Sequence, residues 1–161
     1  MADLASLPYR LNVGAVLFGP DGRVFVGRRP GLMAAAWQLP QGGIDAGEDP
    51  RAAVLRELQE EVGTADAEII GEHPEWLQYD LPPELLGVAW KGKYRGQRQK
   101  WFALRYLGRD GDIRLDADAH PEFDAWKWVE LAELPNLAVA FKRTIYEVIA
   151  RDFAVYARPY T

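Results

Sequence analysis

The residues of this chain best suited to chemistry are three closely spaced glutamates. At 100° per residue, Glu57, Glu60 and Glu61 fall on one narrow face of an expected helix. Like charges three or four residues apart destabilise a helix. A solvated acidic face is the ordinary explanation of such a pattern. Carboxylate oxygens at this density, however, suit Mg²⁺, or Mn²⁺ as an alternative, so the cluster predicts a divalent-cation site.

The helix that presents these glutamates has clear start and stop signals. Asp49 suits the N-cap, and Pro50 suits the first helical position, where its missing N–H is no loss. Gly63 supplies a left-handed residue to end the helix after about three and a half turns. A second face is apolar and is expected to dock the helix onto the protein; it comprises Leu55, Leu58 and Val62.

A glycine-rich loop precedes this helix and can fold tightly against its start. Gly42 and Gly43 tolerate backbone conformations and close contacts that other residues do not. Glu48 and Arg56 are placed to brace the acidic cluster. The loop and helix together therefore look like one functional unit.

Residues 42–64 resemble the Nudix box, the signature of hydrolases that act on nucleoside diphosphates linked to another group. The matching positions are Gly42, Glu48, Arg56, Glu57, Leu58, Glu60, Glu61 and Gly63. Thr64 alone departs, in place of a larger aliphatic residue, and we expect a small packing change there. The resemblance implies an α/β fold, with a mixed β-sheet sandwiched between α-helices. It also implies that Glu57, Glu60 and Glu61 bind the metal and act with Arg56 in catalysis.

The remaining sequence predicts alternating strands and helices without a linker. Strands are expected at 11–18, 24–28, 67–72, 100–107 and 125–129, and a closing helix at 141–153. Residues 37–40 lead into the signature loop, and residues 82–84 indicate a loop with a short helical turn. Such alternation favours a sheet packed between helices. We expect a single Nudix domain over residues 1–161.

Composition excludes several classes of function. A chain of 161 residues with 48% hydrophobic and 27% charged residues is typical of a soluble globular protein. The net charge of −5 argues against broad nonspecific nucleic-acid binding. The absence of cysteine excludes disulfides, and His73 and His120 are too few for a zinc site. No segment resembles a signal peptide or a membrane span. We expect a cytoplasmic protein that binds neither membrane nor DNA.

Strings outside the box narrow the resemblance to two related Nudix groups. They lie at residues 9–14, 37–43, 96–102, 121–123 and 141–143. One group is the bacterial RNA pyrophosphohydrolases, also called dinucleoside polyphosphate hydrolases. The other is the plant-type asymmetric diadenosine tetraphosphate hydrolases, towards which residues 90–92 lean slightly. The resemblance covers about residues 8–153 and does not choose cleanly between the groups.

This resemblance assigns roles outside the box, although each residue also has a plain structural explanation. Glu122 would complete the metal cluster, or be an ordinary solvated loop residue. Phosphate contacts are expected from Arg10, Arg29 and Lys142. Arg28 is an equally cationic neighbour of Arg29, so the choice of Arg29 rests on the resemblance alone. Gln97 corresponds to a substrate contact in the RNA-acting group.

Two further sets of side chains are assigned from their own chemistry. Tyr79 and Phe141 are predicted to stack on bases, although Phe141 also has the spacing of a core residue. A basic run at 91–100, interleaved with aromatic residues, could attract a polyphosphate chain, and Lys91 is its named candidate. The ordinary explanation of such a run is a solvated loop.

Together these features predict a Mg²⁺-dependent hydrolase of phosphoanhydride bonds. A divalent cation would screen the phosphate charge and activate an attacking water. The first substrate hypothesis is a dinucleoside polyphosphate, such as diadenosine tetraphosphate cleaved to ATP and AMP. The alternative is removal of pyrophosphate from 5′-triphosphorylated RNA, which starts messenger decay. A noncatalytic nucleotide-binding module is a remote third hypothesis, because none of the box carboxylates is missing.

Overall fold

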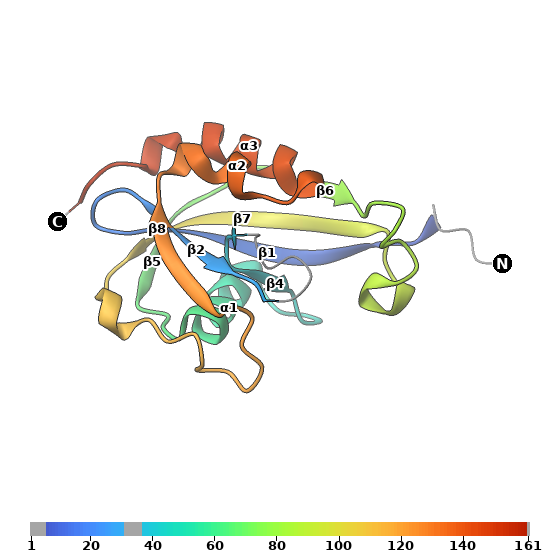
Figure 1. The fold of residues 1–161 in the computed structure, drawn as a ribbon, viewed down its shortest axis with the longest axis horizontal. Coiled ribbons are helices and arrows are strands. Elements are labelled where there is room, and N and C mark those ends of the chain that lie inside the picture. The colour runs from blue at the N-terminus through green and yellow to red at the C-terminus, as the bar shows by residue number, and fades with distance from the viewer. Residues whose placement is uncertain (1–5, 31–36, 161) are drawn as a thin grey trace.

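A computed structural model of the chain describes residues 6–30 and 37–160. A mixed sheet of eight strands lies at its centre, with helices on both faces (Figure 1). The helices are α1 (Pro50–Val62), α2 (Leu134–Leu137) and α3 (Arg143–Asp152). The strands are β1 (Tyr9–Phe18), β2 (Val24–Arg28), β3 (Trp37–Gln38), β4 (Gln41–Gly43), β5 (Ala67–Glu72), β6 (Leu77–Asp80), β7 (Gly96–Tyr106) and β8 (Ala125–Val129). The predicted α/β architecture is confirmed.

The two longest strands lie side by side at the middle of the sheet. β1 and β7 pair in parallel from Tyr9 opposite Gly96 to Phe18 opposite Arg105. The strand order is β3-β2-β1-β7-β5, while β4 pairs with β1, β6 with β7 and β8 with β2. Residues 12–18 of β1 are all buried. That pattern follows from having helices on both faces, because neither side of the strand meets water.

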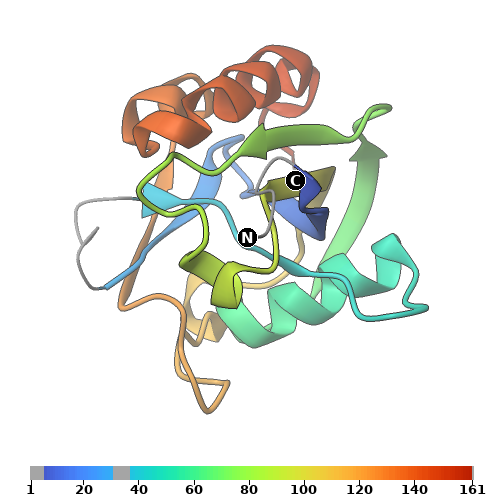
Figure 2. The same cartoon turned by 90° about the vertical axis from the view of Figure 1, so that its right-hand side faces the viewer.

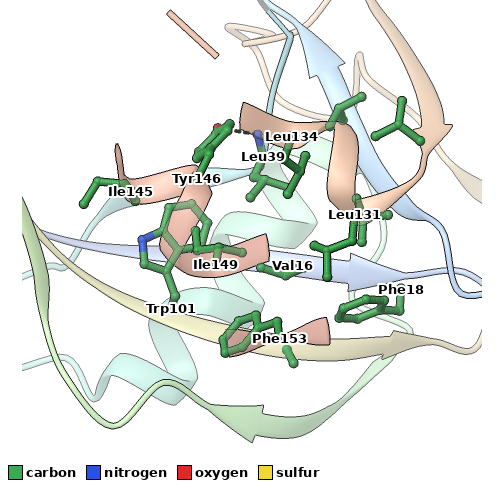
Figure 3. Close-up of a cluster of buried hydrophobic side chains, with 14 of the residues drawn as sticks. Val16, Phe18, Leu39, Trp101, Leu131, Leu134, Ile145, Tyr146, Ile149 and Phe153 are labelled. Atoms are coloured by element: carbon green, nitrogen blue, oxygen red, sulfur yellow. Dashed lines mark hydrogen bonds between the residues drawn. The ribbon is translucent and has the colours of Figure 1, made fainter. Parts of the chain in front are cut away.

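Each face of the sheet has its own apolar core. On one face, Ile145, Tyr146 and Ile149 of α3 pack against the sheet through Val16 and Trp101 (Figure 3). On the other face, residues of α1 including Leu58 and Val62 pack in a second cluster. Figure 2 shows the two helices on opposite sides of the strands. None of the helices within the described ranges is long and apolar enough to cross a membrane.

The signature helix α1 has the predicted bounds. Pro50 is its first residue, and Gly63 ends it with a φ of 83° in the left-handed region. Asp49 holds the extended N-cap conformation, but its side chain makes no capping hydrogen bond. The predicted apolar stripe is shifted, because Val54 is buried whereas Leu55 is only half-buried.

The bounds of several other elements differ from the predictions. β7 begins at Gly96 instead of residue 100, because Gln97 and Gln99 are buried strand residues with side-chain hydrogen bonds. Their polarity resembles that of a loop in the sequence. β1 likewise begins two residues earlier than predicted, and α3 is preceded by a separate 3₁₀ turn at Ala140–Lys142. The short elements β3, β4, β6 and α2 were not predicted as strands or helices.

Candidate active site

A cavity of about 500 Å³ brings together residues that are far apart in the sequence. Its volume lies within the range of small-molecule sites. Its lining includes residues of β1, β3, β4, α1, β6 and β7, together with Arg29, Glu122 and residues of the segments 81–90 and 139–142. Twelve predicted site residues line it: Arg10, Arg29, Gly42, Gly43, Glu57, Glu60, Glu61, Tyr79, Gln97, Glu122, Phe141 and Lys142. The predicted metal, phosphate and base contacts therefore share one space.

The basic side chains of the run at 91–100 do not line this cavity. Lys91 and Lys93 are exposed, and neither lines it. Arg95 pairs with Asp80 at 3.2 Å, and Lys100 pairs with Glu72 at 3.4 Å. A phosphate contact from Lys91 stays a prediction, and the geometry of the cavity does not add to it.

Arg56 of α1 connects the glutamates of this helix to the loop that precedes it. Its Nε donates to Glu48 at 2.8 Å, and its Nη1 donates to Glu57 at 2.8 Å. The same Nη1 lies 3.3 Å from both oxygens of Glu60. Its Nη2 donates to the carbonyl of Gly43 at 2.9 Å, which fastens the loop to the helix. The planar fork of an arginine makes this many contacts, whereas a lysine ammonium would not.

Residues 39–43, which lead into the box, are held by hydrogen bonds to the sheet and to α3. β4 pairs with β1, and Ala15 N donates to the Pro40 carbonyl at 2.9 Å. Leu39 N donates to the Tyr146 hydroxyl at 2.9 Å, shown as the dashed line in Figure 3. Gln41 N then donates to Glu61 Oε2 at 3.0 Å. A backbone N–H of this segment thus holds the Glu61 carboxylate in place.

A glycine is required at position 42 because the Glu57 carboxylate occupies the place of a Cβ there. A Cβ at this position would lie 2.1 Å from the carboxylate carbon of Glu57. No side chain fits there without displacing Glu57, so the box glycine makes room for the box glutamate. The spacing in the sequence indicated a tight loop but not this contact.

Two of the box carboxylates are buried. Glu57 is 9% exposed and Glu61 5% exposed. Burial, followed by repulsion from Glu57 and Glu122, raises the pKa of Glu61 well above its ordinary value. Burial also raises the pKa of Glu57, while Arg56 opposes the shift. Burial and the neighbouring carboxylates therefore disfavour the charged forms of both groups.

This donor set fits a hard divalent cation. Glu57, Glu60, Glu61 and Glu122 supply only carboxylate oxygens, the ligands that such cations prefer. A bound cation would favour the charged form of Glu61, which burial and then repulsion from Glu57 and Glu122 disfavour. In the described part of the chain, no three acidic or histidine side chains already surround a common cation position. Oxygens of Glu57 and Glu60 are hydrogen-bonded to Arg56 instead.

Cationic groups lie around the cavity. Arg29 lines it and approaches Glu122 at 3.9 Å, whereas Arg28 pairs with Asp124 at 2.8 Å and does not line it. This geometry agrees with the choice of Arg29 over its neighbour. Burial, with Arg29 nearby, lowers the pKa of Lys142 to about 8. Lys142 also lies 3.4 Å from the side-chain oxygen of Gln38.

An aromatic pair forms another part of the lining. The rings of Tyr79 and Phe141 lie 5.6 Å apart. Gln97 donates to the Tyr79 hydroxyl at 2.9 Å, and its own side-chain oxygen is buried without a hydrogen-bond partner. Phe141 packs partly against the core and also lines the cavity, so both explanations of its spacing apply.

Sequence reasoning assigned no role to several residues that line the cavity. Gln38 and Gln41 lie within strings already noted, but their contacts are set by tertiary pairing. The ring of Trp90 lies 5.5 Å from the Arg10 guanidinium. Trp90 and Lys91 both have positive φ, at 50° and 58°. No local pattern in the sequence signals that conformation.

Comparison with protein families identifies one domain family. The family described as NUDIX domain matches residues 8–149. An RNA pyrophosphohydrolase of Gluconacetobacter diazotrophicus is 58% identical, and the match covers 99% of each chain. An RNA pyrophosphohydrolase of Acidiphilium cryptum is 59% identical over 98% of each chain.

Solved structures agree on the fold. An E. coli dihydroneopterin triphosphate pyrophosphohydrolase has a TM-score of 0.69 at 20% identity, covering 90% of this chain and 99% of that one. A C. elegans Ap4A hydrolase has a TM-score of 0.63 at 22% identity, with 91% and 98% covered. At such identities the likeness is one of fold.

Proposed function

Because the chain belongs to the Nudix family of hydrolases, we propose that it is an RNA pyrophosphohydrolase. Its reaction would release pyrophosphate from the 5′-triphosphate end of RNA and leave a 5′-monophosphate. Two relatives with that name are 58% and 59% identical over nearly the whole of both chains. The motif strings had placed a dinucleoside polyphosphate first, and the names of the relatives favour the second hypothesis instead.

The observation on which this proposal rests is the composition of one cavity. Four carboxylates, three cationic side chains and an aromatic pair all line it. A triphosphorylated nucleoside needs these three kinds of contact: a cation site for the phosphates, positive side chains around them and a flat surface for the base. A noncatalytic binding module would not need the carboxylate cluster.

The chain's own residues would hold the substrate for in-line attack. Arg10, Arg29 and Lys142 are placed to bind phosphate oxygens, and the arginines offer forked donors. Tyr79 and Phe141 would receive the first base on their ring faces. Arg56 lies behind the carboxylates and orients them without reaching the substrate.

The bond to be broken joins the α- and β-phosphates. Water adds to phosphorus, the bridging oxygen leaves with pyrophosphate, and the proton of the water passes to the surroundings. Nudix hydrolases use divalent metal cations; here Mg²⁺ held by Glu57, Glu60, Glu61 and Glu122 would screen the phosphates and activate the water. The positive side chains would stabilise the departing pyrophosphate.

The test measures Mg²⁺-dependent turnover of 5′-triphosphorylated RNA and of diadenosine tetraphosphate, the substrates of the two hypotheses, side by side. We expect pyrophosphate release from a short 5′-triphosphorylated RNA. Turnover should fall about a hundredfold or more in Glu61→Gln, because a neutral amide replaces one of the four carboxylates that would hold the cation and thereby position the reacting groups. Glu68→Gln, which alters an exposed glutamate on β5, is the matched control and should keep wild-type turnover. A wild-type protein that binds the RNA without releasing pyrophosphate would refute the proposal.

A further inference from the structure

A chain of side-chain hydrogen bonds runs from the core of the protein to the active-site cavity. Trp101 Nε1 donates to Gln99 Oε1 at 3.2 Å, and Gln99 Nε2 donates to Asn12 Oδ1 at 3.1 Å. Asn12 Nδ2 then donates to Gln41 Oε1 at 2.7 Å. The first three side chains are at most 2% exposed and do not line the cavity, whereas Gln41 does. The chain of hydrogen bonds therefore ends at the substrate site.

The pairing of the strands places these side chains next to one another. Asn12 lies opposite Gln99 where β1 and β7 pair in parallel. Gly14 lies opposite Trp101 on β7 and opposite Gln41 on β4. Side chains two residues apart on a strand share a face, so Gln99 and Trp101 project to the same side of the sheet. A Cβ at Gly14 would overlap the ring of Trp101, so the glycine leaves room for the indole.

The indole of Trp101 decides the direction in which each amide of this chain points. An indole N–H donates and cannot accept, so Gln99 must turn its oxygen toward Trp101. The NH₂ group of Gln99 then meets Asn12, which must present its oxygen. Asn12 has its NH₂ group left for Gln41, whose oxygen accepts from it. One donor-only group therefore fixes the orientation of three amides.

The last group of the chain is the NH₂ of Gln41. Within residues 6–30 and 37–160, no protein group accepts a hydrogen bond from Gln41 Nε2. The other polar groups of this residue have partners, since its oxygen accepts from Asn12 and its backbone N–H donates to Glu61 at 3.0 Å. A phosphate oxygen accepts hydrogen bonds, so it is attracted by an amide NH₂ and repelled by an amide oxygen. The chain thus turns the phosphate-binding end of Gln41 away from the core.

We propose that Gln41 contacts the substrate through this NH₂ group, which donates to an oxygen of the phosphate chain. Trp101, Gln99 and Asn12 are positioning residues, because they act on the substrate through the direction of the Gln41 amide. This inference rests on the proposed function and adds a neutral donor to the cations that line the cavity. Gln41 holds Glu61 by its backbone and phosphate by its side chain, and so fixes the two relative to each other.

Gln41→Met tests the contact, because methionine has a similar length and no N–H group. KM for 5′-triphosphorylated RNA should rise about tenfold or more, as for loss of a hydrogen bond to a charged group. kcat should stay within about threefold of wild type, because a contact made in both the bound substrate and the transition state affects binding alone. Gln78→Met is the matched control, since Gln78 is an exposed strand residue outside the cavity lining, and it should keep both wild-type constants. An unchanged KM in Gln41→Met would overturn the inference.

Binding of α,β-methylene-ATP separates this inference from the proposed function. The probe carries a 5′-triphosphate whose α–β bridge cannot be hydrolysed. With Mg²⁺ present, its Kd measured by calorimetry should rise about tenfold in Gln41→Met and stay at the wild-type value in Gln78→Met. If the wild type released no pyrophosphate from RNA, the proposed function would fail while this comparison still tested Gln41. Equal affinities of wild type and Gln41→Met would contradict the contact.

NMR of the side-chain amides tests the direction of the chain. In the free protein, the NH₂ protons of Asn12 and Gln99 should exchange slowly with D₂O and those of Gln41 rapidly, because only Gln41 lines the cavity. The Gln41 signal, identified by its absence in Gln41→Met, should shift when α,β-methylene-ATP binds. Slow exchange at Gln41, or a signal that does not shift, would mean that its oxygen faces the cavity and would refute the assignment.

Gln99→Met tests the positioning residues. It removes the donor to Asn12, so the amides of Asn12 and Gln41 lose their fixed direction. KM for the RNA should rise about twofold, as for a donor that faces the cavity in half of the molecules. In a Gln41→Met background the same change should leave KM unaltered. An equal rise in both backgrounds would show a purely structural effect and refute the positioning role. If Gln99→Met does not fold, the exchange rates in the wild type decide the direction of the chain.

Discussion

At the scale of single residues, the site depends on the absence of side chains at two glycines as much as on its hydrogen bonds and ion pairs. Gly42 leaves space that the Glu57 carboxylate fills, and Gly43 does the same for Arg10. Arg56 then ties the loop to the helix through Gly43 and Glu48. The positions of Glu57 and Arg10 therefore depend on two glycines that leave room for them, and Arg56 fixes the loop relative to the helix.

Gly42→Ala should abolish most activity without unfolding the protein. The added methyl group would displace the Glu57 carboxylate, and a misplacement of about 1 Å in a reacting group lowers turnover about a hundredfold. Steady-state pyrophosphate release from RNA measures the effect. Gly111→Ala is the control, since a Cβ there meets nothing within 4 Å. Turnover of Gly42→Ala within twofold of wild type would contradict this account of the glycine.

Glu48 gives a prediction about acid stability. Hydrogen bonds from Arg56, then from the Asp45 backbone, lower the pKa of Glu48 from 4.5 to about 2. Because the folded pKa is the lower one, the carboxylate adds stability above pH 4.5 and loses it as the pH falls towards 2. The difference in unfolding free energy between wild type and Glu48→Gln should therefore be constant above about pH 5 and shrink below it. Urea titrations across this range measure the difference, and one independent of pH would refute the assignment.

At the scale of elements, α3 supports the active site although it contributes none of the box residues. Its Tyr146 accepts a hydrogen bond from Leu39 N, one residue before the loop turns at Pro40. Burial raises the pKa of Tyr146, so its phenol stays protonated at neutral pH. A buried hydrogen bond therefore links α3 directly to the segment that leads into the box.

Tyr146→Phe should destabilise the fold by about 1–3 kcal/mol, because the Leu39 N–H would be left buried without its partner. Turnover should fall as well, since the loop also holds Glu61 through Gln41 N. Tyr9→Phe removes an exposed hydrogen bond to Asp80 and serves as the control, with an effect within about 0.5 kcal/mol. Equal unfolding free energies for the two variants would exclude this support role.

At the scale of the whole molecule, cation binding and folding should be coupled. Only the folded chain gathers four carboxylates around one cavity, so Mg²⁺ should stabilise it by about 2.7 kcal/mol at a hundred times its Kd. That corresponds to a rise in Tm of roughly 5–10 °C for a chain of this length. Scanning calorimetry with Mg²⁺ and with Na⁺ at matched ionic strength measures it. Glu61→Gln should show a smaller rise, and an identical rise in both proteins would place the cation elsewhere.

The sequence by itself determined the family, the bounds of the signature helix α1 and the positions of its three clustered glutamates, because each of these depends on one short segment. A helix period, a proline at one end and a glycine at the other specify α1 without reference to the rest of the chain. The box positions are likewise fixed by spacing along one segment. Strands 24–28, 67–72 and 125–129 were predicted with their observed bounds for the same reason.

Only the tertiary structure decided which of several similar residues line the site. Arg28 and Arg29 are equivalent as sequence, but Asp124 pairs with Arg28 and leaves Arg29 at the cavity. The basic run at 91–100 has the composition of a phosphate site, yet its lysines and arginines lie outside the cavity lining. Gln97 appears as a loop residue until its burial beside Tyr79 is known. Contacts between segments more than a hundred residues apart depend on pairing and burial, and no local pattern contains that information.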